Sequence, residues 1–105
     1  MKKLFISQPM KGKTDEYIKA ERAKAIEEAK KVVNDNIEVI DSFFEGAPTD
    51  AKPLWFLGKS FELLSKADVA YFAKDWEKFR GCKMEHTACL EYGIKAIEYN
   101  EGIKD

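Results

Sequence analysis

The fold is decided by the stretch Leu4-Phe5-Ile6-Ser7-Gln8-Pro9 and by the segment Thr14-Asp15-Glu16 that follows it. The apolar run predicts a short buried strand that ends before the proline, because proline has no amide hydrogen to donate to a sheet. The threonine can cap a helix, and the two acids suit the positive end of its dipole. Apolar residues then recur at helical spacing to about Asn34. They are Ile18, Ala25, Ala29 and Val33.

Two further helices are predicted downstream. Asp50 is placed as the N-cap of the first, with Pro53 in the opening turn, where a missing amide hydrogen costs nothing. The second runs over residues 81–92 and ends at Gly93, which can adopt the left-handed conformation of a helix C-terminus. The first of these helices has one face of apolar residues. They are Leu54, Leu57, Phe61 and Leu64.

Three more strands are predicted between and after these helices, at residues 37–41, 68–73 and 94–97. Strands that alternate with helix-sized crossovers form a parallel sheet with right-handed connections, and the helices cover both faces. We therefore expect an α/β fold with a four-stranded parallel sheet. At 105 residues, the chain is expected to form a single domain over residues 1–105.

Composition narrows the classes of partner. The chain has 18 Lys and Arg against 19 Asp and Glu, a net charge of -1, which argues against binding to a nucleic acid polymer or a membrane surface. The first apolar run, three residues long, is shorter than the roughly 7–15 of a signal peptide, and we expect a cytoplasmic protein. Cys82 and Cys89 lie on one predicted helix with their Cα atoms roughly 10 Å apart, beyond disulfide reach.

The expected binding site lies beyond the carboxyl ends of the strands, where open parallel sheets bind their ligands. Three loops reach this side of the sheet, at residues 7–13, 41–49 and 74–83. Their side chains and free amides suit a small ligand with an anionic group and a flat ring. The residues expected to contact it are Ser7, Gln8, Lys11, Gly12, Asp41, Phe43, Trp76 and Gly81. The alternative for the first loop is a tight turn with solvated lysines.

Glu85 is the candidate catalytic residue, because an acid in the first turns of the third helix points toward the carboxyl ends of the strands. The alternative is an exposed acid that the helix dipole favours. Cys82, His86 and Cys89 share its helical stripe, which makes a metal site or a cysteine nucleophile conceivable. Helical spacing of cysteines also marks a core face, and no second group of ligands exists elsewhere. We therefore expect packed thiols, no metal and no cofactor.

Three segments resemble the nucleoside 2-deoxyribosyltransferase-like superfamily, and especially its small bacterial and phage members of unknown function. They are Ile6-Ser7-Gln8-Pro9-Met10, Ala67-Asp68-Val69-Ala70-Tyr71-Phe72 and Arg80-Gly81-Cys82-Lys83-Met84-Glu85-His86. The resemblance implies a flavodoxin-like (Rossmann-like) fold and cleavage or transfer at an N-glycosidic bond. In that family a Gly-x-x-x-Glu element supplies the nucleophile, matched here by Gly81 and Glu85. The turn after the first strand holds sugar or phosphate, matched by Ser7, Gln8 and Gly12.

Three positions depart from the family pattern. An aspartate usual in the second helix is replaced by Ser60, and one six residues before the glutamate is replaced by Phe79. A tyrosine common in the first strand is replaced by Leu4 or Phe5. With one retained carboxylate, the sequence offers no evident proton donor for the leaving base.

Three functions are therefore expected in turn. The first is a hydrolase or deoxyribosyltransferase that acts on a nucleoside or nucleotide through Glu85. The second is a non-catalytic nucleotide sensor or sponge, with aromatic residues such as Phe43, Phe44 and Trp76 against the base and Lys11 and Lys13 on phosphate. The third is a protein interaction module. Because one small sheet makes a shallow cleft, we also expect a homodimer in which the second copy covers the pocket, as in the enzymes it resembles.

Overall fold

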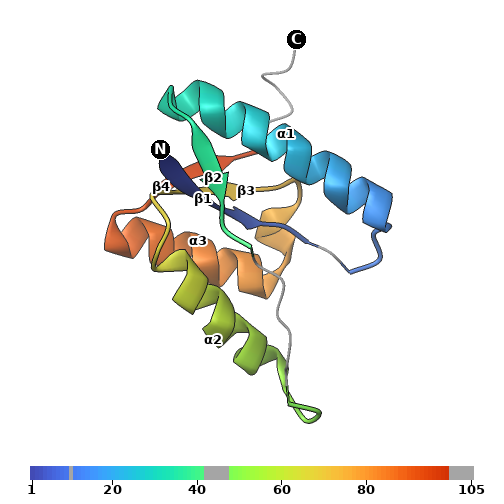
Figure 1. Ribbon diagram of the computed structural model, residues 1–105. Coiled ribbons are helices and arrows are strands. Elements are labelled where there is room, and N and C mark those ends of the chain that lie inside the picture. The colour runs from blue at the N-terminus through green and yellow to red at the C-terminus, as the bar shows by residue number, and fades with distance from the viewer. Residues whose placement is uncertain (10, 42–47, 100–105) are drawn as a thin grey trace.

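A computed structural model describes residues 1–9, 11–41 and 48–99 of the chain. These residues form an α/β fold with a four-stranded, all-parallel sheet in the order β2-β1-β3-β4 and three α-helices (Figure 1). The flavodoxin-like, Rossmann-like fold class predicted from the sequence is thereby confirmed. The elements in chain order are β1 (Lys2–Ser7), α1 (Asp15–Val33), β2 (Ile37–Val39), α2 (Pro53–Leu64), β3 (Val69–Phe72), the 3-10 helix η1 (Trp76–Lys78), α3 (Arg80–Tyr92) and β4 (Lys95–Glu98).

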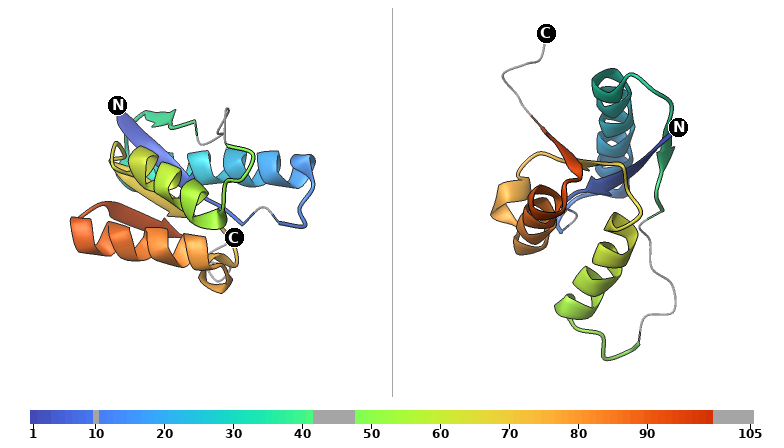
Figure 2. Two further views of the ribbon diagram at one scale, coloured as in Figure 1. Left: turned by 90° about the horizontal axis from the view of Figure 1, so that it is seen from below. Right: turned by 90° about the vertical axis from the view of Figure 1, so that its left-hand side faces the viewer.

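The helices cover both faces of the sheet, as predicted. α1 lies on one face, and α2 and α3 lie on the other (Figure 2). Successive strand residues point to opposite faces, so β1 contributes Leu4 and Ile6 to the core beneath α1 and Phe5 to the core beneath α2 and α3. All four residues of β3 are buried, because this strand is central and covered on both sides.

The ends of α1 and α3 follow the expected capping chemistry. The Thr14 side chain accepts a hydrogen bond from the Tyr17 amide at 3.1 Å, and Asn34 adopts the left-handed conformation at the other end of α1. Gly93 ends α3 with φ at 74°. These caps confirm the predicted boundaries of both helices to within a residue.

The predicted cap of α2 is wrong. Asp50 lies outside the helix, and Lys52 is the N-cap, without a side-chain hydrogen bond to the first turn. The reason is Pro53, which occupies the first helical position and so fixes the cap at the residue directly before it. The acid two residues further upstream is too early in the chain to serve.

The apolar face predicted for α2 is only partly buried. Leu64, in the last turn, is 2% exposed, whereas Leu54 is 74% exposed and Phe61 39% exposed. The helix packs its C-terminal end against the rest of the molecule and projects outward at its N-terminal end (Figure 2). An apolar surface therefore remains open beside the carboxyl ends of the strands.

The predicted strand at residues 37–41 is shorter in the structure, where β2 ends at Val39. Phe43 and Phe44 fall outside the described residues. Within the described ranges, none of the helices is long and apolar enough to span a membrane.

Candidate functional site

The candidate site forms where the chain leaves β1 and β3. These neighbouring strands end together, with Ser7 opposite Phe72, and the Ala73 amide donates to the Ser7 carbonyl at 3.0 Å. From β1 the chain crosses to β2 on one side, and from β3 it crosses to β4 on the other. Ligands bind at this reversal of strand order in open α/β sheets.

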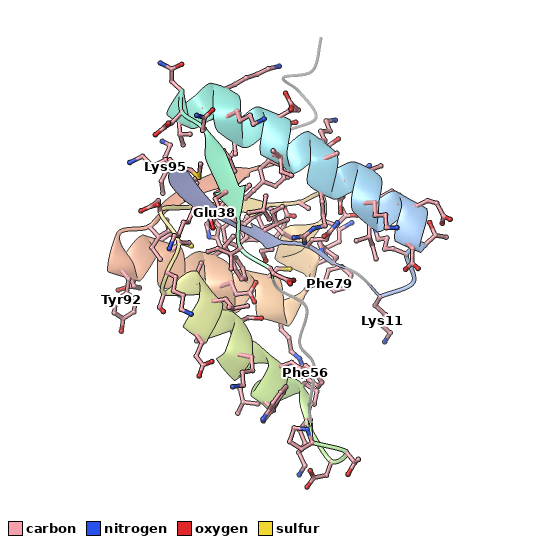
Figure 3. The ribbon with its side chains drawn as sticks, viewed as in Figure 1. Lys11, Glu38, Phe56, Phe79, Tyr92 and Lys95 are labelled. Carbon is pink, nitrogen blue, oxygen red and sulfur yellow. The ribbon has the colours of Figure 1, made fainter. Side chains whose placement is uncertain are left out.

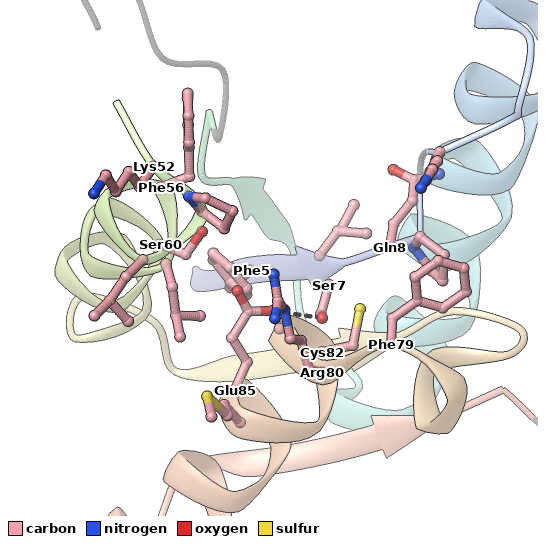
Figure 4. Close-up of a pocket in the computed structure, with 18 residues that line it drawn as sticks. Phe5, Ser7, Gln8, Lys52, Phe56, Ser60, Phe79, Arg80, Cys82 and Glu85 are labelled. Carbon is pink, nitrogen blue, oxygen red and sulfur yellow. Dashed lines mark hydrogen bonds between the residues drawn. The ribbon is translucent and has the colours of Figure 1, made fainter. Parts of the chain in front are cut away.

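A cavity of about 870 Å³ opens at this point. Its walls are the end of β1, the N-terminal half of α2 and the first turns of α3 (Figure 4). The volume lies toward the upper end of what small-molecule sites offer, about 300–1,000 Å³. Four of the residues predicted from the sequence to contact a ligand contribute to the lining. They are Ser7, Gln8, Lys11 and Gly81.

Glu85 is the only acid among the described residues that line this cavity. Its side chain is 7% exposed, and its Oε1 atom accepts a hydrogen bond of 2.6 Å from the Ser7 hydroxyl (Figure 4). Burial raises the pKa of Glu85 above its ordinary value, and hydrogen bonds from Ser7 and Ser60 offset part of that increase. The alternative of a solvated acid at a helix end therefore does not hold.

Cys82 lies beside this pair and also lines the cavity, at 7% exposure. Burial raises its pKa, and a hydrogen bond with Ser7 lowers it only in part. Burial likewise raises the pKa of Cys89, to about 11, in the core beneath α2 and α3. Both cysteines are free. The raised pKa values favour the neutral thiols, which suits packing better than nucleophilic catalysis.

Three cations line the same cavity from three different elements. Lys11 follows β1, Lys52 caps α2 and Arg80 begins α3, and all three are exposed. Figure 3 shows Lys11 and Phe56 on separate sides of the molecule's lower end. Positive groups on several sides of a cavity attract an anionic ligand and screen less well when partly shielded from water.

Two aromatic side chains lie on opposite sides of Glu85. Phe56 lines the cavity from α2, and Phe79 lines it beside Gln8 (Figure 4). Trp76, predicted to stack on a ligand, is not among the lining residues. Its ring stacks on His86 with centroids 4.1 Å apart, and the His86 Nε2 atom lies 2.5 Å from a carboxylate oxygen of Glu98.

Three other predicted contacts lie apart from the cavity lining or outside the described residues. Gly12 is exposed with φ at 79°, a left-handed conformation that favours glycine in this turn. Asp41 is exposed and interacts electrostatically with Arg22. Phe43 falls in the range that the structure does not describe.

The sequence reasoning missed the wall that α2 contributes. Lys52, Phe56 and Ser60 line the cavity but do not follow a strand, so the rule of strand ends does not find them. Two signals were present: apolar residues on more than one face of α2, and Ser60 at a position where the resembled family has an acid. Together they mark this helix as part of a site.

Among the described residues, no group of three or more histidine, cysteine, aspartate and glutamate side chains is arranged to hold a metal ion. Comparisons of the chain with protein-family models, curated proteins and solved structures find no match.

Proposed function

We propose that this protein is a cytoplasmic enzyme that hydrolyses, or transfers across, the N-glycosidic bond of a nucleoside or nucleotide, with Glu85 as its nucleophile. One observation carries the proposal. The only acid in the described lining of the cavity is buried, is held by Ser7, and stands at the point where the strand order reverses.

The proposed reaction has two steps. The Glu85 carboxylate attacks the anomeric carbon, the carbon–nitrogen bond breaks, and the base leaves with the bonding electrons and gains a proton from solvent or a neighbouring group. Water then cleaves the glycosyl ester in a hydrolase, or a second base attacks it in a transferase. The hydrogen bond from Ser7 orients one oxygen of the carboxylate, which leaves the group fixed for attack.

The lining of the cavity is compatible with a nucleotide. Lys11, Lys52 and Arg80 supply positive charge for a phosphate, and Phe56 and Phe79 supply apolar rings for a base. Gly81, at the start of α3, has open space where a side chain would project, which leaves room for a ligand near Glu85.

A second candidate function is a nucleotide sensor or sponge that binds without catalysis. Retaining glycosidases usually use two carboxyl groups about 5–5.5 Å apart, and here Glu85 lacks a second acid in the described lining. Ser60 and Phe79 line the cavity at positions where acids are expected from the resemblance. In this alternative the buried carboxyl group serves only as a hydrogen-bonding partner.

The deciding experiment incubates the purified protein with nucleosides, deoxynucleoside monophosphates and NAD, and separates the products by chromatography. Release of a free base by the wild type, and its loss in Glu85→Gln, supports the enzyme. Thermal stabilisation by a nucleotide that is not consumed, retained in Glu85→Gln, supports the sensor. If no compound in the panel is cleaved or raises the melting temperature, both nucleotide functions are rejected.

We also propose a homodimer in which the second copy covers the cavity. Leu54, Phe56 and Met84 line it and are 74%, 40% and 50% exposed. Large apolar side chains that gather at the mouth of a cavity mark a surface that another protein covers. A second copy would also exclude water from the reacting carboxylate.

A further inference from the structure

The side-chain amide of Gln8 is committed to α1, although the residue stands at the cavity. Its Nε2 atom donates to the Ile18 carbonyl at 3.1 Å and to Glu21 Oε1 at 2.9 Å. Its Oε1 atom accepts from Arg22 Nη1 at 3.3 Å. An amide group has two hydrogens to donate, so both are already used inside the protein. Gln8 is 8% exposed.

The network continues in both directions from Gln8. On one side Arg22 is half-buried and interacts electrostatically with Asp41, just beyond β2. On the other side the Tyr17 hydroxyl donates to Glu21 Oε2 at 3.4 Å, and Lys13 Nζ lies 4.5 Å from the centre of the Tyr17 ring. The network thus joins the end of β2, the first two turns of α1 and the turn that follows β1.

We propose that Gln8 is a positioning residue, which anchors the turn after β1 to α1 so that Ser7 faces Glu85 and Lys11 stands at the cavity. Its catalytic consequence rests on the function proposed above, whereas its mechanical role does not. Asp41 belongs to the same network and acts through Arg22. Two residues that sequence reasoning assigned to ligand contact thereby acquire a different role.

The geometry explains why Gln8 can control its neighbour. Ser7 and Gln8 are consecutive residues at the end of β1, and their side chains reach opposite sides of the chain, Ser7 to α3 and Gln8 to α1. Three hydrogen bonds on Gln8 therefore hold the peptide that carries Ser7. Loss of these bonds would leave buried donors and acceptors unsatisfied and would free the turn.

A charge exchange tests this assignment. Gln8→Glu removes both donated hydrogen bonds and sets a second carboxylate against Glu21. We expect amide hydrogen exchange of residues 11–14 to accelerate about tenfold, and the dissociation constant for 2′-deoxyadenosine 5′-monophosphate to rise about tenfold. Exchange in the buried strand β3 should stay unchanged. Binding of deoxyadenosine should weaken less, because it carries no phosphate for Lys11.

Adding Glu21→Gln to this variant should restore both measurements to within about threefold of the wild type, because the new amide at position 21 donates to the carboxylate at position 8. Asn36→Asp is the matched control, since it makes the same amide-to-carboxylate change before β2, at the opposite end of the sheet. It should leave both measurements unchanged.

Normal exchange in Gln8→Glu, or failure of Glu21→Gln to restore it, overturns the positioning role. If Gln8→Glu alone does not fold, the double variant decides the matter, and its failure to fold has the same meaning. Exchange is measured without ligand. A wild type that neither binds nor cleaves any nucleotide would reject the proposed function and leave the exchange result to judge Gln8.

Discussion

At the scale of single residues, Glu85 combines a charge-bearing group with a buried position. Because burial raises its pKa, the folded protein holds this proton to a higher pH than the unfolded chain does. The contribution of Glu85 to folding stability is therefore fully present below its unfolded value, near 4.5, and declines as the pH rises from there through the raised folded value.

Glu85→Gln removes this dependence while it keeps the shape of the side chain. We expect the free energy of unfolding of the variant, relative to that of the wild type, to increase as the pH rises above about 4.5 and to be constant below it. Urea unfolding at a series of pH values measures the difference. A difference that does not vary with pH would show that the carboxyl group titrates normally.

Ser7→Ala should act on the same group through its missing hydroxyl. The hydrogen bond from Ser7 lowers the pKa of Glu85, so its loss should raise that pKa further and move the rising limb of base release to higher pH. We also expect a loss of about 1 kcal/mol in stability at 25 °C. The pH dependence of kcat measures the first effect. Ser65→Ala, on an exposed serine outside the cavity, is the control.

The meeting of Ser7, Gly81 and Glu85 could be predicted, because strand ends and helix starts in a parallel sheet converge by topology alone. The direction of the Trp76 ring could not. Asp75 adopts a left-handed conformation with φ at 69°, and a short 3-10 turn follows, which seats the ring on His86. Neither that backbone conformation nor the histidine partner leaves a clear pattern in the sequence.

At the scale of secondary-structure elements, α1 and α2 begin differently. Thr14 caps α1 with a hydrogen bond, whereas Lys52 begins α2 with a long cationic side chain that makes none. The sequence predicted the first cap because threonine and two acids form a familiar start. It did not predict the second, since lysine is unsuited to this position by helix chemistry and is explained better by its place at the cavity.

Lys52→Ser should therefore strengthen the helix and weaken the site. A serine cap contributes about 0.5–1 kcal/mol, which thermal unfolding should detect as a raised melting temperature. Loss of one exposed cation should weaken binding of a nucleoside monophosphate about threefold and leave the matching nucleoside unaffected. Titration calorimetry compares the two ligands. A variant that gains stability and binds the phosphate equally well would remove Lys52 from the proposed site.

At the scale of the whole molecule, the exposed apolar surface beside the cavity governs assembly. Light scattering of the wild type should give twice the 12.0 kDa mass of one chain. Leu54→Glu should give a single-chain mass, because a buried, unpaired charge opposes association. Val32→Glu, on a half-exposed residue of α1 on the other face, should keep the double mass. A wild type with the mass of one chain contradicts the dimer.

The strand order β2-β1-β3-β4 also has a consequence for solubility. β2 and β4 each pair with one neighbour among the described strands, which gives both an outer side with backbone groups that could recruit another chain into a growing aggregate. β2 is only three residues long, and exposed charges accompany both strands: Glu38 on β2, Lys95 and Glu98 on β4 (Figure 3). Lys95→Val should make the protein turbid at a lower concentration on prolonged incubation, while Lys31→Val on α1 should not. The surface charges that contribute little to the fold thereby keep a protein of nearly zero net charge from forming intermolecular sheets.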